Sequence, residues 1–166
     1  MFENIIKNVH NRHPLIHCIT NYVSINDCAN IVLACGGAPI MAEDINEVSQ
    51  ITSICQGLDI NIGMLNDNKL SSMLKAGATA NELGIPVILD PVGAGSSDYR
   101  IKAVQNLMSN VQFGVIRGNV SEIKAIAAKQ GIHNIAAGVY ETMQKNKSAM
   151  GVEAGIADKI TDDNIK

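Results

Sequence analysis

Asp90 has the setting in this sequence that points most directly to chemistry. It closes the apolar run VILD of residues 87–90 and is followed by Pro91 and by two glycines in the spacing GxG, Gly93 and Gly95. Glycines after a strand let backbone N–H groups approach a ligand closely, and the N-terminus of a following helix favours an anion. Taken alone, however, the loop favours a simple tight turn in which the strand-end carboxylate accepts backbone hydrogen bonds.

The glycine pair does not match the nucleotide-binding fingerprints. It lacks the third glycine of the dinucleotide motif, and it follows the fourth predicted strand instead of the first. The GKS or GKT of a phosphate-binding P-loop is also missing. A flavodoxin-like or dinucleotide-binding domain is therefore the least favoured interpretation.

Arg117 and Glu122 bring further charge to the same predicted edge as Asp90. Two carboxylates and a guanidinium suit Mg²⁺ with a phosphate, because hard oxygen ligands hold the cation and the arginine fork holds the anion. The alternative is an arginine–carboxylate ion pair that only joins two loops. As a group, the three residues favour phosphate chemistry.

The elements that must position these residues alternate along the chain. Apolar residues at helical spacing predict helices over residues 2–12, 24–35, 44–55, 66–83, 98–109 and 120–129, and short apolar runs predict strands over residues 14–20, 38–41, 58–64, 85–90 and 113–118. The alternation and the short connections predict a three-layer α/β fold, with a mostly parallel sheet and helices on both faces. With no linker in the sequence, residues 1–166 are expected to form a single domain.

Polar residues and glycines follow the predicted strands, at the edge where parallel α/β sheets bind ligands. This edge comprises Thr20, Asn21, Met41, Ala42, Asn61, Gly63, Asp90, Arg117, Asn119 and Glu122. The amide of Asn21 can donate and accept hydrogen bonds toward a ring nitrogen or a hydroxyl, and Met41 offers a polarizable wall for a flat heterocycle.

The amino-acid composition limits the classes of molecule that this protein is expected to bind. The net charge is −3 and the basic residues are scattered, which argues against nucleic-acid binding and favours a small-molecule ligand. The first residues contain no apolar stretch of signal-peptide or membrane-span length, so we expect a cytoplasmic protein with no membrane partner.

Four cysteines lie in apolar segments without CxxC spacing, and we expect them to be buried thiols of a reducing compartment: Cys18, Cys28, Cys35 and Cys55.

A zinc site near the N-terminus is an alternative use of His10, His13, His17 and Cys18. It is disfavoured because Pro14 ends the helix that would present the first two histidines. His17 and Cys18 are adjacent on a predicted strand and point to opposite faces.

Five separated segments, in this order, resemble the hydroxyethylthiazole kinase family: HPLIHCITNYV, GGAPIMAE, LDINIGML, ANELGIPVILDPVGAG and VIRGNVSEI. The resemblance runs from about His13 to Ile126, and each segment includes a predicted strand end. It implies a ribokinase-like fold, a homotrimer with its active site between subunits, and ATP- and Mg²⁺-dependent phosphorylation of the hydroxyl of 4-methyl-5-(2-hydroxyethyl)thiazole, an intermediate of thiamine biosynthesis.

The resemblance also implies roles for individual residues. The thiazole contacts would be Asn21, Val23, Met41 and Gly63, the last approaching from a neighbouring subunit. Asp90 and Glu122 would be the catalytic acids near Mg²⁺ and the phosphates, and Arg117 and Asn119 would bind the phosphates of ATP.

One family feature is missing from this sequence. The later GTGC or GAGC segment, which supplies the family's anion hole and its catalytic cysteine, does not occur, so the chain resembles the N-terminal portion of a longer kinase domain. Residues 127–166 match loosely and receive no catalytic role, and we expect His133 on the surface or in a loop. A non-catalytic module that binds thiazole or serves oligomerisation is the alternative function.

Overall fold

The computed structural model describes residues 2–129 of the chain, and the expectations for residues 130–166, His133 included, lie outside this part. Residues 2–126 form one compact unit. The strands are β1 (Leu15–Ile19), β2 (Ala38–Met41), β3 (Gly57–Asn61), β4 (Val87–Asp90) and β5 (Val115–Ile116). The helices are α1 (Phe2–Arg12), α2 (Ile25–Ala34), α3 (Val48–Ile54), α4 (Asp67–Glu82), α5 (Asp98–Asn110) and α6 (Val120–Lys129).

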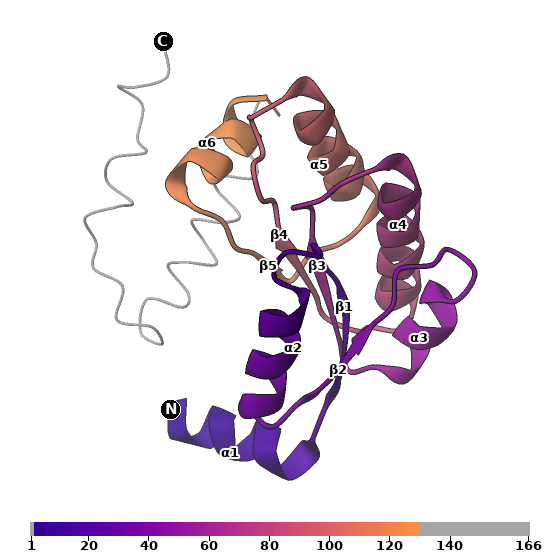
Figure 1. The fold of residues 1–166 in the computed structure, drawn as a ribbon, viewed down its shortest axis with the longest axis vertical. Coiled ribbons are helices and arrows are strands. Elements are labelled where there is room, and N and C mark those ends of the chain that lie inside the picture. Colours follow the sequence, from indigo (N-terminus) through magenta and orange to yellow (C-terminus); the bar gives the residue numbers. More distant parts are fainter. Residues whose placement is uncertain (1, 130–166) are drawn as a thin grey trace. The chain divides into compact units, whose positions relative to one another are not determined.

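The five strands form one parallel sheet in the order β2-β1-β3-β4-β5 (Figure 1). All four strand pairs are parallel, as the alternation of elements predicted. The order places β1 in the interior of the sheet, so its carboxyl end lies beside those of β2 and β3. The register pairs Asn61 at the end of β3 with Asp90 at the end of β4. Polar residues far apart in sequence therefore meet at the carboxyl edge.

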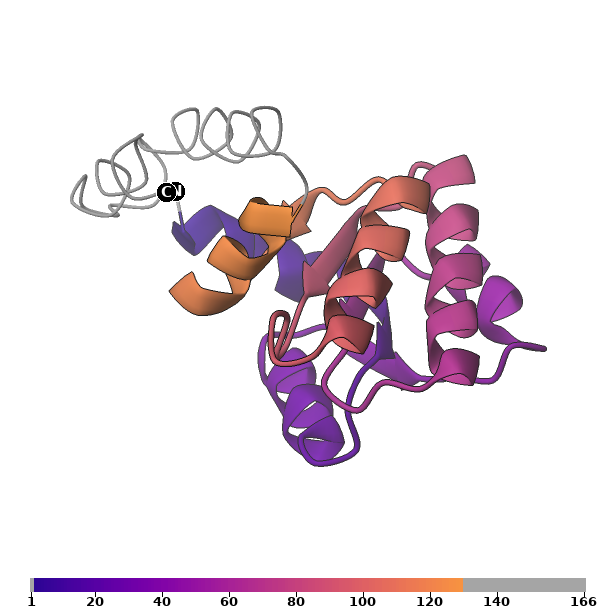
Figure 2. The same cartoon turned by 90° about the horizontal axis from the view of Figure 1, so that it is seen from above.

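Helices α3, α4 and α5 cover one face of the sheet, and α2 lies on the opposite face (Figure 2). Alternate strand residues point toward the α4 and α5 layer, because side chains of a strand alternate between its two faces. The buried core joins these strand residues to the helices and includes Ile60, Leu89, Met73, Ala76, Val104 and Leu107. The expected layering, with helices on both faces, is confirmed.

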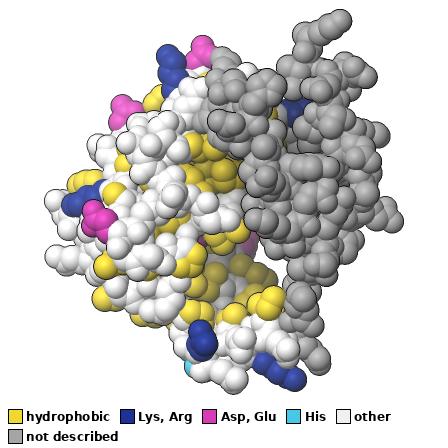
Figure 3. Space-filling model, turned by 180° about the vertical axis from the view of Figure 1, so that it is seen from behind, with side chains coloured by type: hydrophobic (Ala, Val, Ile, Leu, Met, Phe, Trp, Pro, Cys, Tyr) yellow, Lys and Arg dark blue, Asp and Glu magenta, His cyan; other side chains and the backbone are white. Residues whose placement is uncertain are grey.

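The other face of the sheet carries a row of residues aligned across four strands. Cys18, Asp59, Ile88 and Val115 are successive partners in the strand register. Ile88 is 41% exposed and Val115 is 52% exposed, and β5 pairs with β4 alone among the described strands. Seen from behind, hydrophobic side chains gather on the described part of the surface (Figure 3).

Most of the predicted elements are shorter in the structure, and a helix and a strand lose the largest share of their length. The helix expected over residues 44–55 begins only at Val48, because the Asp44 side chain accepts a hydrogen bond from the Asn46 N–H and holds a turn before it. The fifth strand, expected over residues 113–118, is limited to Val115–Ile116.

Among the described residues, none of the helices combines the length and hydrophobicity needed to cross a bilayer.

Asp59 sits in the middle of the less covered face, which predicts an unusual pH dependence of stability. Burial, with help from the charge of Asp90, raises the pKa of Asp59 to about 6 against the weaker opposing effect of Arg117. The folded state therefore binds more protons than the unfolded state between about pH 4 and pH 6. Stability should fall as the pH rises through this window.

We expect Asp59→Asn to be more stable than the wild type at pH 7, by at most about 3 kcal/mol, with the gain vanishing below about pH 4. Urea unfolding followed by circular dichroism at several pH values measures this. Ile88→Asn, which puts an amide at the paired position of the neighbouring strand, is the control and should show no such gain. A benefit of Asp59→Asn that stays constant from pH 4 to pH 8 would contradict the account.

Candidate functional site

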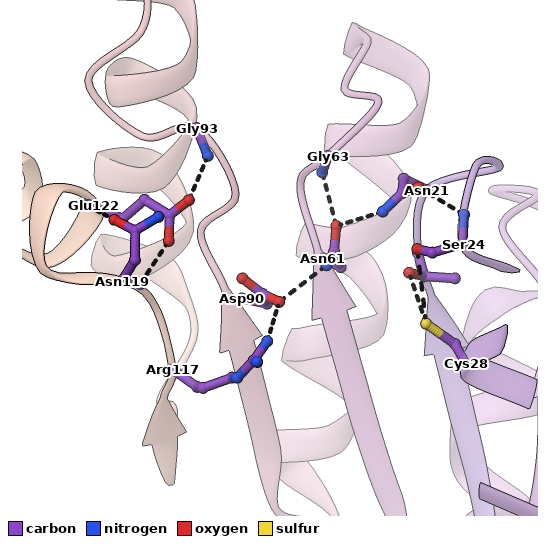
Figure 4. A network of polar contacts seen from close by, with 11 residues as sticks. Asn21, Ser24, Cys28, Asn61, Gly63, Asp90, Gly93, Arg117, Asn119 and Glu122 are labelled. Atoms are coloured by element: carbon purple, nitrogen blue, oxygen red, sulfur yellow. Dashed lines mark hydrogen bonds and ion pairs between the residues drawn. The ribbon is translucent and has the colours of Figure 1, made fainter. Parts of the chain in front are cut away.

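Asp90 ends β4 at the carboxyl edge of the sheet, and its carboxylate joins two neighbouring strands (Figure 4). Its Oδ2 accepts from Asn61 Nδ2 at 3.1 Å and from Arg117 Nη1 at 3.0 Å. Both bonds reach the same oxygen, so Oδ1 has no hydrogen-bond or ion-pair partner within the described part of the chain. A carboxylate oxygen is thus left available to a cation or a donor group.

The surroundings of Asp90 include groups that favour its charged form and groups that disfavour it. Its side chain is 16% exposed, whereas that of Arg117 is 79% exposed. Burial raises the pKa of Asp90, and the nearby negative charge of Glu122 adds to this, while Arg117 and Asn61 oppose it. Because Arg117 stands mostly in water, it compensates the Asp90 charge only partly and keeps donors free for a second anion.

Glu122 fixes two backbone segments at once. Its Oε1 accepts from the Gly93 N–H at 2.9 Å, and its Oε2 accepts from the Asn119 N–H at 2.8 Å. In return, Asn119 Oδ1 accepts from the Glu122 N–H at 3.0 Å, so the two residues form a reciprocal cap at the start of α6. Asn119 was expected to cap this helix, and it does. The capping role of Glu122, three positions into the motif, was missed.

The glycine loop after Asp90 requires both of its glycines. Gly93 has φ +68° and Gly95 has φ +90°, a backbone region that side chains rarely adopt. A Cβ on Gly95 would also lie 2.6 Å from the Cβ of Ala125 in α6. The loop therefore packs directly on α6, and Glu122 of that helix holds it.

Asn21 and Gly63 come together on the other side of Asp90. Asn21 Nδ2 donates to Asn61 Oδ1 at 3.3 Å, and the Gly63 N–H donates to the same oxygen at 2.8 Å. A Cβ on Gly63 would lie 2.8 Å from the Asn21 Cβ. One chain thus brings Asn21 and Gly63 together, and the expected approach of Gly63 from a neighbouring subunit stays a prediction.

The other two residues expected to contact thiazole lie outside this hydrogen-bond network. Val23 is 86% exposed in the loop before α2. Met41 ends β2 and is half-buried. Ser24 occupies the expected N-cap position of α2, yet its side chain does not cap the helix. Instead Asn21 Oδ1 accepts from the Ser24 N–H at 3.0 Å.

A buried lysine, missed in the sequence, ties the loops after β1 and β2 together. The side chain of Lys69 in α4 is 1% exposed, and its Nζ lies 2.8 Å from Glu43 Oε2. The same Nζ donates to the Thr20 carbonyl at 2.8 Å and stands 4.2 Å from the centre of the Tyr22 ring. Tyr22 also donates to Glu43. A lysine in a polar stretch of an amphipathic helix gives no sequence signal for burial.

Arg100 of α5 joins the loops that follow β3 and β4, as Lys69 joins those that follow β1 and β2. Its Nη1 donates to the carbonyls of Ile62 at 2.6 Å and Val92 at 2.8 Å, and its Nη2 donates to that of Gly63. These bonds hold the turn of Gly63 against the glycine loop. The sequence shows Arg100 only as a basic residue in the first turn of a helix, where arginine is usually solvated, so it does not indicate these bonds.

His17, one of the four side chains considered for a zinc site, has a protein partner at each ring nitrogen. His17 is fully buried; its Nε2 donates to the Ala42 carbonyl at 2.8 Å, and its Nδ1 lies 2.8 Å from the Thr52 hydroxyl oxygen. Burial lowers its pKa, which agrees with a neutral ring. No group of three or more metal-ligating side chains occurs within residues 2–129.

The expectation of four buried thiols is correct for Cys18 and Cys55 only. All four cysteines are free, but Cys28 is half-buried and Cys35 is exposed at the end of α2. Burial also raises the pKa of Cys18 to about 12, so this thiol stays protonated.

The arrangement can serve anion and cation binding side by side. Asp90 offers a hard oxygen, Arg117 offers exposed guanidinium donors, and the amides of Asn21 and Asn61 offer hydrogen bonds on the other side of Asp90. All of the expected polar site residues lie on this one edge: Asn21, Gly63, Asp90, Arg117, Asn119 and Glu122.

Comparison with known proteins gives consistent matches. The model of the hydroxyethylthiazole kinase family matches residues 6–161. Hydroxyethylthiazole kinase of Clostridium acetobutylicum is 53% identical over 165 residues, which cover 99% of this chain and 55% of the relative. That of Alkaliphilus metalliredigens is 58% identical over 124 residues, or 75% of this chain and 46% of the relative. The chain spans about half the length of the curated relatives it matches.

A solved structure of a hydroxyethylthiazole kinase protein from Pyrococcus horikoshii OT3 is also similar. It superposes with a TM-score of 0.73 at 37% sequence identity, covering 85% of this chain and 53% of that one. This match confirms the ribokinase-like α/β fold that the sequence predicted.

We predict that Lys69→Met destabilises the protein by about 2–3 kcal/mol, because it leaves the Thr20 carbonyl without its donor and Glu43 without its cation. Lys75→Met is the matched control on the same helix. Lys75 donates to the Ile45 carbonyl at an exposed position, so its loss should cost no more than about 0.5 kcal/mol. Equal losses of unfolding free energy in urea for the two variants would show that Lys69 does not fasten the loops.

Proposed function

Because the chain belongs to the hydroxyethylthiazole kinase family, we propose that it takes part in the ATP- and Mg²⁺-dependent phosphorylation of the hydroxyl of 4-methyl-5-(2-hydroxyethyl)thiazole, in thiamine biosynthesis or salvage. The observation that carries the proposal is the continuous polar edge from Asn21 to Arg117. It brings together, within one chain, the residues expected for the alcohol and those expected for the phosphates. We call 4-methyl-5-(2-hydroxyethyl)thiazole the thiazole alcohol below.

In this proposal the two sides of Asp90 have different tasks. Asn21 and Gly63, with Val23 and Met41 beside them, bind the thiazole ring. Arg117 and Asn119 bind the phosphates of ATP, for which the exposed guanidinium of Arg117 is suited. The sites of thiazole and phosphate then meet at Asp90, where a hydroxyl has to approach a phosphate.

Asp90 fits the proposed Mg²⁺ contact. Its Oδ1 has no partner within the described residues, and carboxylate oxygen is the ligand type that Mg²⁺ prefers. Both oxygens of Glu122 already accept backbone N–H bonds, so we assign Glu122 mainly to holding the glycine loop and adding negative charge. A bound Mg²⁺ would neutralise phosphate charge.

A homotrimer would bury Val23, the most exposed of the residues proposed to bind the thiazole. Val23 is 86% exposed in the single chain, and an active site between subunits would enclose it. We propose this assembly together with the activity. Its measurement is the molar mass in solution by light scattering.

The second candidate is a non-catalytic module that binds the thiazole alcohol or serves oligomerisation. The observation that favours it is that Asn21 and Gly63, two of the residues expected for the alcohol, are joined through Asn61 within this chain. Calorimetry separates the two functions. Binding of the alcohol without measurable affinity for Mg²⁺–ATP supports the module, whereas affinity for both supports the kinase.

Transfer of labelled phosphate from ATP to the thiazole alcohol tests the kinase directly. We expect transfer by the wild-type chain and a loss of about a hundredfold or more in Asp90→Asn, because a charged contact to the reacting groups is removed. Glu82→Gln removes a carboxylate from the last turn of α4, at the opposite edge of the sheet, and should leave transfer unchanged. Equal transfer by Asp90→Asn and the wild type would rule out the proposed role of Asp90.

A further inference from the structure

Asn61 lies at the centre of the polar edge, and the proposed function gives it no role. It ends β3, is 8% exposed, and uses both ends of its amide (Figure 4). Its Nδ2 donates to Asp90, and its Oδ1 accepts from Asn21 and from the Gly63 N–H. It is the residue that contacts both sides of the proposed site.

The direction of each hydrogen bond follows from backbone groups. The Gly63 N–H can only donate, so the amide group of Asn61 that faces it at 2.8 Å is the oxygen. The amide nitrogen of Asn61 must then face Asp90. In the same way the Ser24 N–H, 3.0 Å away, fixes the oxygen of Asn21 and turns its nitrogen toward Asn61.

A directed chain of hydrogen bonds therefore crosses the edge. It runs from the Ser24 N–H through Asn21 and Asn61 to Asp90, where Arg117 donates from the other side. Hydrogen bonds arranged in such a chain polarise one another. A change at one end alters the strength of the bonds along it.

The Gly63 backbone packs closely against both amides. A Cβ on Gly63 would stand 2.8 Å from Asn21 Nδ2 and 2.9 Å from Asn61 Oδ1. On this side neither side chain has room to move. If Asn21 shifts toward a ligand, the hydrogen bond that it donates to Asn61 changes, and the bond from Asn61 to Asp90 changes with it.

We propose that Asn61 is a positioning residue that couples the two halves of the site, so that occupancy beside Asn21 alters the hydrogen bonding of Asp90. The identity of the ligand beside Asn21, the thiazole alcohol, rests on the proposed function. The coupling itself rests on the hydrogen bonds and the packing. Three other charged groups act on Asp90 without passing through Asn61: Arg117 bonds it directly, and Glu122 and Asp59 interact with it through their charge.

The first experiment needs no ligand. Side-chain amide signals of ¹⁵N-labelled protein are compared between the wild type and Asp90→Asn. We expect the signals of both Asn61 and Asn21 to shift. The amide of Asn81, which bonds Gln112 between α4 and the loop after α5, is the internal reference and should not move.

Asn61→Ala then separates a relayed effect from a field effect through space. It removes the amide that joins Asn21 to Asp90 and adds no charge. In this background, Asp90→Asn should no longer shift the Asn21 signal. An Asn21 shift of the wild-type size in the Asn61→Ala background would overturn the coupling.

The second experiment measures binding of the thiazole alcohol by calorimetry. We expect Asp90→Asn to change its Kd by about threefold or more in the wild-type background, and by less than about 1.5-fold in Asn61→Ala. Asn61→Ala removes the amide that joins Asn21 to Asp90 and adds no charge beside Asp90. A residue with only a structural role would lower stability in urea and leave the effect of Asp90→Asn on the Kd unchanged.

The outcomes distinguish this inference from the proposed function. If the alcohol binds the wild type and the effect of Asp90→Asn is the same in both backgrounds, the coupling is wrong and the function survives. If the alcohol binds neither protein, the proposed function fails, and the amide signals alone decide the coupling. Should Asn61→Ala fail to fold, Asn61→Ser, whose side chain is too short to join Asn21 to Asp90, takes its place in the binding cycle, with the same expected loss of coupling.

Discussion

A half-buried carboxylate at the end of an interior strand is the interaction on which the rest of the site depends. Burial raises the pKa of Asp90 and so disfavours its charged form, and hydrogen-bond donors oppose this effect. The parallel register supplies one donor by pairing Asn61 with Asp90 at the ends of β3 and β4. Arg117, just past β5, supplies the other. The order and register of the strands therefore determine which donors stabilise the charge of Asp90.

The loops around Asp90 are held by side chains that reach backbone groups of other elements. Lys69 fastens the loop after β1 to Glu43 in the loop after β2, and Arg100 fastens the turn after β3 to the loop after β4. Glu122 joins the glycine loop to the start of α6. A site supported in this way keeps its geometry before any ligand arrives, which reduces the ordering cost of binding.

Sequence patterns predicted the parallel sheet and the position of Asp90, because apolar strands and helix periodicity are local signals and strand ends share one edge. They also predicted Asn119 as a cap. They could not predict that Lys69 is buried or that Arg100 bonds three carbonyls, because both depend on which loops the tertiary fold places beside the helix. The turn at Asp44 was not predicted for a different, local reason: the Asp44 side chain competes with the helix for a backbone N–H group. Asn61 was placed on the edge, but its role follows only from the orientation of its amide.

The family assignment and the geometry lead to one central claim, that the edge from Asn21 to Arg117 is a single binding site for an alcohol and a phosphate. A crystal structure of the chain with 4-methyl-5-(2-hydroxyethyl)thiazole tests it most directly. The account predicts the ring beside Asn21 and Gly63, with its hydroxyl directed toward Asp90 and with Asp90 still bonded to Asn61 and Arg117. A ligand bound away from this edge, or an Asp90 side chain turned away from both partners, would contradict it.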